Sequence, residues 1–217
     1  MRRRPLSSST LRGALVSSIA LTGAACVDVV SLDPTIGPGE AIAVPALIGD
    51  WIEVIPGSEQ EADTMWVRVT RERDSTRYLV TSIRSGDTDP SRFGRPMAWL
   101  RVRPAGDRLL AELTPARTDV VVDSVVARYG GMVQLLHQLV VLEPMGDSLH
   151  YWLFDGDSVR TALADARCPQ PGRVIDRHGT LVFSGDGREL RMTTDCLIAV
   201  PGVLGQPETL HRWRAHY

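Results

Sequence analysis

The segment MAWLRVRPAGDRLLAEL, residues 97–113, decides the fold class of this chain. Apolar residues alternate with polar or charged ones over residues 97–103, and a second apolar segment covers residues 109–113. Between them lies Ala105-Gly106-Asp107, a connection typical of a β-hairpin. Alternation with a period of two, bounded by turn residues, predicts a pair of half-buried antiparallel strands.

The same pattern recurs on both sides of this hairpin. Further strands are expected at residues 51–55, 65–70, 78–83, 120–126, 133–142, 149–154, 180–183 and 210–217. Such a series of hairpins predicts a mainly β protein of about nine strands. We expect an antiparallel meander that closes into a small barrel, with a sandwich as the alternative, since closure removes exposed strand edges.

Two short helices are expected among the C-terminal strands. Asp157 or Ser158 is the expected N-cap of the first helix, because apolar residues follow at helical spacing. Asp186 and Glu189 have the spacing of a capping box, which predicts the start of the second helix.

The N-terminus has the pattern of a secretory signal. Four arginines lie within residues 1–12, an uncharged and mostly apolar stretch covers residues 13–21, and small residues lead to Cys26. This pattern predicts a signal peptide over residues 1–25, cleaved before Cys26. The apolar stretch is shorter than the ~20 residues that span a bilayer, which disfavours a retained anchor.

The segment LTGAAC, residues 21–26, resembles the lipobox of bacterial lipoproteins, although Gly23 stands where the lipobox has leucine. Gly23 and Ala25 also fit secretory cleavage without lipid, and that alternative stays open. The resemblance implies lipidation of Cys26 and attachment to a membrane through this N-terminal lipid. Val27 after the cysteine, rather than aspartate, implies an outer membrane lipoprotein that faces the periplasm.

The remaining chain divides into two parts. Frequent Pro and Gly over residues 26–46 predict a stiff, extended tether, and residues 47–217 are expected to form a single domain. With Cys26 assigned to the lipid, Cys168 and Cys196 are left, and they can form a disulfide in an oxidising compartment. The alternative is that both are small buried apolar residues.

The composition excludes several functions. All 24 basic residues are arginine, so chemistry that needs a lysine is impossible. Removing residues 1–25 takes away four arginines and no acid, which changes the net charge from −2 to −6. An acidic mature chain argues against nucleic-acid binding, because phosphate contacts require clustered positive charge.

The expected first barrel strand begins with Gly49-Asp50-Trp51, and a Gly-x-Trp motif at this place resembles the lipocalin (calycin) group. More loosely, the whole chain resembles lipocalin-like bacterial lipoproteins whose function is not established. The resemblance covers residues 49–154 and the last strand. It implies that Gly49 and Trp51 close one barrel end and that Arg212 or Arg214 packs over the Trp51 ring in a cation–π contact. The two helices do not lie where a lipocalin has its single helix.

No residue pattern supports catalysis. Asp155-Gly156-Asp157 resembles the nucleophile motif of haloacid-dehalogenase phosphatases, but the chain has no lysine and the context is antiparallel. His137 and His150 lie in strands, and if both point inward they form a metal or proton-linked site. No other metal-ligand spacing is present, and neither a metal nor another cofactor is expected.

Aromatic residues on several strands are candidates for the lining of an interior cavity: Trp66, Trp99, Tyr151 and Trp152. We therefore expect a lipid-anchored barrel without enzymatic activity that binds a small apolar ligand or an envelope partner. A structural or assembly lipoprotein with a filled core is the alternative, and a hydrolase that uses His137 with acidic neighbours is a minor one. An interior pocket of ~300 Å³ or more separates the first two.

Overall fold

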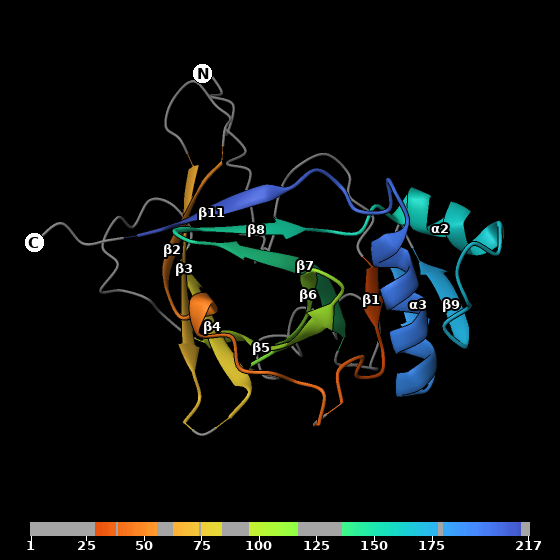
Figure 1. The fold of residues 1–217 in the computed structure, drawn as a ribbon, viewed down its shortest axis with the longest axis horizontal. Coiled ribbons are helices and arrows are strands. Elements are labelled where there is room, and N and C mark those ends of the chain that lie inside the picture. The colour runs from red at the N-terminus through yellow and green to blue at the C-terminus, as the bar shows by residue number, and fades with distance from the viewer. Residues whose placement is uncertain are drawn as a thin grey trace, which may run out of the picture.

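The computed structural model describes residues 29–37, 39–55, 63–73, 75–83, 96–116, 136–177 and 180–213. In these residues a closed barrel of eight antiparallel strands carries three additional strands of the same sheet and two α-helices on one side (Figure 1). The predicted fold class, a mainly β protein whose meander closes into a lipocalin-like barrel, is confirmed. The predicted strand at 120–126, Cys26 and Arg214 lie outside the described residues.

The barrel follows the chain as a meander from β2 to β8. Its strands are β2 (Gly49–Ile55), β3 (Asp63–Arg71), β4 (Arg77–Ile83), β5 (Pro96–Ala105), β6 (Arg108–Pro115), β7 (His137–Met145), β8 (Ser148–Trp152) and β11 (Glu208–Arg212). β11 lies between β8 and β2 and thereby closes the barrel. The β5–β6 hairpin turns at Gly106, whose φ of +66° favours glycine.

Alternation along the strands fills the barrel. On β5, Ala98, Leu100 and Val102 belong to the interior core, while Trp99 and Arg101 take the other face. Fully buried Trp51 and Tyr78 are the largest side chains of this core.

A second core lies between the outer wall of the barrel and the helices. β1 (Val29–Ser31) pairs antiparallel with the start of β7 and parallel with β10 (Thr180–Ser184), and β9 (Arg173–Arg177) pairs with β10. The helices are α2 (Gly156–Ala164) and α3 (Gly187–Ala199). Their apolar faces pack against outward side chains of the barrel such as Leu110, Leu139 and Val141.

Two covalent or ionic links attach α3. The expected disulfide is confirmed, since Cys168, just after α2, is bonded to Cys196 in α3. Arg103 of β5 is only 2% exposed; its Nη1 lies 2.6 Å from Asp195 Oδ1, and its Nη2 donates to Thr194 Oγ1 at 3.0 Å. The disulfide thus joins α3 to the segment after α2, and Arg103 joins it to β5.

The described part of the expected tether, residues 29–37 and 39–46, is packed on the domain rather than extended away from it. β1 joins the sheet, Ile36 is fully buried, and Ile42 N donates to Val102 O of β5 at 2.9 Å. Proline and glycine set the bends of this segment, but its apolar side chains, Val29 and Val30 among them, determine that it is buried.

The predicted N-terminus of α3 is confirmed, whereas the predicted N-cap of α2 is wrong. The capping box at Asp186 and Glu189 is present with both of its hydrogen bonds. The N-cap of α2 is Asp155, not Asp157 or Ser158, because Asp155 accepts from Ser158 N at 2.8 Å. Among the described residues no helix is long and apolar enough to cross a membrane.

Candidate functional site

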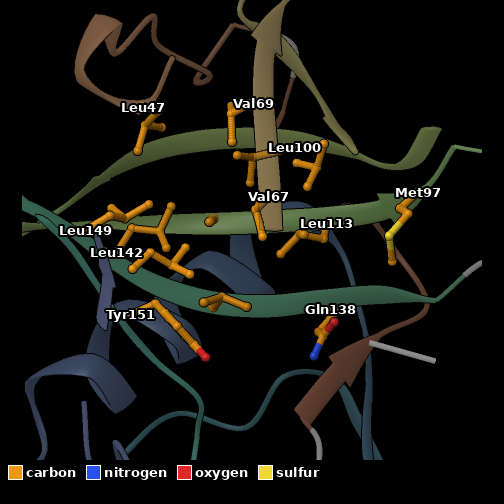
Figure 2. A pocket seen from close by; sticks show the side chains of 14 residues that line it. Leu47, Val67, Val69, Met97, Leu100, Leu113, Gln138, Leu142, Leu149 and Tyr151 are labelled. Carbon is orange, nitrogen blue, oxygen red and sulfur yellow. The ribbon is translucent and has the colours of Figure 1, made fainter. Parts of the chain in front are cut away.

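The barrel interior contains a cavity of about 110 Å³. Its wall is almost entirely aliphatic, from Leu47 and Leu149 near the Trp51 end to Met97 and Leu113 near the other end (Figure 2). The polar groups among the lining side chains belong to Gln138 and Tyr151. The arrangement can therefore hold a small apolar group.

The cavity exists because the side chains in the middle of the barrel are small. Valines and Ala111 on β3, β4, β6 and β7 line the middle of the barrel, whereas Trp51 and Tyr78 fill the end at which β2 begins. Met97, Leu113 and Gln138 at the opposite end are only half-buried. The cavity thus extends from a filled end toward a more exposed one.

Trp51 and Arg212 close the filled end of the barrel. The Arg212 guanidinium carbon lies 4.4 Å from the centre of the Trp51 ring, and its Nη1 and Nη2 donate to Ile48 O and Ala46 O, both at 2.9 Å. Gly49 has φ +144°, and a Cβ there would lie 2.6 Å from Arg212 Nη1. Only glycine leaves room for this guanidinium.

Two carboxyl groups and a phenol form a cluster on neighbouring strands, in which Glu53 and Tyr151 are buried and Glu208 is half-buried. The Tyr151 hydroxyl on β8 donates to Glu53 Oε1 of β2 at 2.6 Å and also contacts Glu208 Oε2 of β11, the strand between them. A phenol has a single proton, so each carboxylate receives only part of its hydrogen bond when both are ionised. A proton on one carboxyl group allows both contacts to be full hydrogen bonds.

The pKa of Glu53 is shifted in the direction that favours such a proton. Burial raises the pKa of Glu53, the hydrogen bond from Tyr151 opposes this, and the adjacent Glu208 raises the pKa further, to about 7. The pKa of Tyr151 is also raised, mainly by burial and then by the two carboxyl groups. The cluster thus retains a proton under mildly acidic to neutral conditions.

Glu53 is incompletely satisfied. Its Oε2 is one of four buried side-chain polar atoms in the described residues without a hydrogen-bond partner. The other three belong to Arg103, Arg108 and Asp195, each of which is in an ion pair. Within the described part of the chain, no cationic side chain contacts Glu53 or Glu208.

His137 points to the outer side of the barrel, opposite its neighbour Gln138, and does not reach the cavity. Its Nδ1 lies 3.1 Å from Glu112 Oε1 and 3.2 Å from Thr114 Oγ1. A nucleophile–histidine–carboxylate relay needs the hydroxyl and the carboxylate on opposite ring nitrogens. This cluster has both on one nitrogen and lacks that geometry.

Glu112 instead fastens the N-terminal segment to the barrel. Its Oε2 accepts from Thr35 N at 2.5 Å, Thr35 Oγ1 at 2.7 Å and Ile36 N at 3.1 Å. Burial alone would raise the pKa of Glu112, but the hydrogen bonds from His137 and Thr35 lower it. The result is a satisfied structural carboxylate.

The other candidate residues do not meet in the interior. His150 packs edge-on against Trp152 on the outside of β8, so the two histidines do not form an interior site. Of the four aromatic candidates only Tyr151 lines the cavity. Trp66 packs on Trp213, Arg77 lies over Trp99, and Arg108 lies over Trp152. No cluster of three or more potential metal ligands exists in the described ranges.

Strand alternation in the sequence places Glu53 and Glu208 in the interior, although no motif marks them as site residues. Glu53 is two residues after Trp51 and Glu208 two before Leu210, so strand alternation places both on the interior face. Fold and cavity together define a small lipocalin-like barrel with an apolar interior site. No protein-family model, curated protein or solved structure is similar enough to this chain to count as a match.

Proposed function

We propose that this protein is a lipocalin-like, lipid-anchored envelope protein without enzymatic activity whose barrel binds a small apolar ligand. The apolar cavity of about 110 Å³ carries the proposal. Empty apolar cavities of ~150 Å³ are known to bind benzene. The ligand, or the part of it that enters the barrel, therefore has about six non-hydrogen atoms or fewer.

The Cys168–Cys196 disulfide supports an exported location, because disulfides persist in oxidising compartments. Lipidation of Cys26 would hold the domain at the membrane surface, in an outer membrane facing the periplasm. Intact-mass analysis of the protein from membranes tests this part. A chain that begins at Cys26 and carries acyl groups is expected, and an unmodified Cys26 or a retained signal would refute it.

The cavity size also favours a second candidate, a structural or assembly lipoprotein with a filled core. Pockets for drug-sized ligands usually measure ~300–1,000 Å³, well above this cavity. The second core, which covers the outer β5–β7 wall with helices, shows that much of the molecule serves packing.

Ligand binding is tested with benzene as the probe and thermal unfolding as the readout. Saturating benzene should raise the Tm of the wild type, as binding to the native state alone requires. Ala111→Leu puts three more heavy atoms into the cavity and should abolish the shift. Ala199→Leu, on the exposed face of α3, is the matched control and should retain it. No shift in the wild type would favour the filled-core candidate.

A further inference from the structure

Tyr151 lies between the apolar cavity and the carboxyl pair of Glu53 and Glu208. Its ring lines the cavity beside Leu142 and Leu149, and its hydroxyl points away from these leucines (Figure 2). That hydroxyl contacts both Glu53 and Glu208. The carboxyl pair therefore lies one side chain away from the cavity.

Among the described residues, no cation is paired with Glu53 or Glu208. Ionised carboxylates are costly to bury without such a partner, and Glu53 is the more deeply buried of the two. In addition Glu53, which is 6% exposed, has an oxygen without a hydrogen-bond partner. The molecule meets this cost by keeping a proton on the pair.

An ammonium group can provide both the positive charge and the hydrogen-bond donors that the described residues do not provide to this pair. It has one positive charge and three N–H donors, whereas the pair without its proton offers carboxylate oxygens as acceptors, among them Glu53 Oε2, which has no donor within the described residues. A hydrogen bond between charged groups contributes more than one between neutral groups. An apolar group on the same nitrogen would extend from the carboxyl pair past Tyr151 into the cavity.

We propose that the Glu53–Glu208 pair binds the ammonium group of a small primary amine whose apolar part occupies the barrel cavity; this inference rests on the ligand-binding function proposed above. The amine replaces the shared proton as the positive charge on the pair, so binding releases a proton to solvent. Neutral and anionic molecules with the same apolar part cannot form these charged hydrogen bonds and should bind more weakly. The barrel thereby selects amines among small amphiphiles.

The test measures binding of n-butylammonium, 1-butanol and butyrate to the purified full-length mature protein by titration calorimetry at pH 7. Butylammonium should bind about tenfold or more tightly than butanol, and butyrate should not bind detectably. Repetition in two buffers with different ionisation enthalpies should show net proton release on butylammonium binding. Equal affinities for butylammonium and butanol would overturn the inference.

Two variants test the contribution of the Glu53–Glu208 pair to binding separately from that of the apolar cavity. Glu53→Gln and Glu208→Gln should each weaken butylammonium binding about tenfold while leaving the benzene-induced Tm shift unchanged. Glu72→Gln, an exposed matched control on the chain between β3 and β4, should change neither. Undiminished butylammonium binding in both interior variants would refute the inference.

Benzene distinguishes the two proposals. If benzene stabilises the wild type but butylammonium does not bind, the amine inference fails and the apolar-ligand function stands. If neither binds, the proposed function fails as well. Tight binding of Ca²⁺ instead of butylammonium would also overturn the inference, because it would show a site for inorganic cations.

Discussion

Replacing Glu53 by glutamine should change how the stability of this protein depends on pH. Burial, opposed by the Tyr151 hydrogen bond and reinforced by Glu208, raises the pKa of Glu53 from 4.5 to about 7 in the folded protein. Between these two pH values the native state holds a proton that the unfolded state has lost. The contribution of Glu53 to stability is therefore complete below pH 4.5 and is lost as pH rises toward 7.

The size of the effect follows from the same two values. Each pH unit of difference in pKa corresponds to about 1.4 kcal/mol, so the interval from 4.5 to about 7 amounts to roughly 3 kcal/mol. Glutamine cannot ionise and removes this term, although it keeps the shape of the side chain. Relative to the wild type, Glu53→Gln should therefore gain roughly 3 kcal/mol of stability between pH 4.5 and pH 8.

Urea unfolding at several pH values, with the disulfide intact, measures this difference. Glu72→Gln serves as the control, because Glu72 is an exposed partner of Arg77 and its replacement should change stability by a small and nearly constant amount. The groups that face Glu53 in the described residues, Tyr151 and Glu208, remain in place in both proteins. If the difference between Glu53→Gln and wild type is the same at pH 4.5 and pH 8, the reasoning is wrong.

Three further predictions concern the framework of the barrel and are read from urea unfolding. Replacing Cys168 and Cys196 by serine should cost about 3–4 kcal/mol, as the sequence separation of 28 requires, and reduction of the wild type should cost a similar amount. Gly49→Ala should cost about 2 kcal/mol, because its φ of +144° strains alanine and the new Cβ collides with the Arg212 guanidinium, and an Arg212→Ala background should remove only the part due to the collision. Glu112→Gln should cost about 2 kcal/mol at pH 7 and less at pH 3, because the lowered pKa of Glu112 gives stability that is lost as pH falls. Equal costs at both pH values would contradict the last prediction.

Alternation along the strands predicted the barrel because it determines which side chains face inward, whatever the partner strand is. Residues 97–113 form β5 and β6 in the register that their hairpin predicts. The same reasoning does not say what covers an outer wall. Leu110 and Val141 are buried beneath helices, and their burial depends on contacts with segments far away in the sequence. The second core was therefore not predictable from local pattern.

Two expectations differ from the structure for the same physical reason. Residue type suggests aromatic side chains as the cavity lining, but Trp99 lies between Ala98 and Leu100 and so has the opposite orientation to these interior residues. Proline and glycine content suggests an extended N-terminal segment, but Ile36 in this segment is fully buried. In both cases the position of a side chain relative to its neighbours carries more information than composition.

The buried glutamates Glu112 and Glu53 differ in how many hydrogen bonds the fold provides to them. Glu112, on the outer wall, accepts three hydrogen bonds on one oxygen and contacts His137 with the other, and its pKa is lowered. Glu53, on the interior face, has one hydrogen-bonded oxygen, one without a partner, and a raised pKa. Burial is similar, at 1% and 6% exposure, so the difference lies in the number of donors that the fold provides. The fold provides enough donors for both oxygens of Glu112 but not for those of Glu53. A site that binds a hydrogen-bond donor from outside the chain requires such an incompletely bonded carboxyl group beside the cavity.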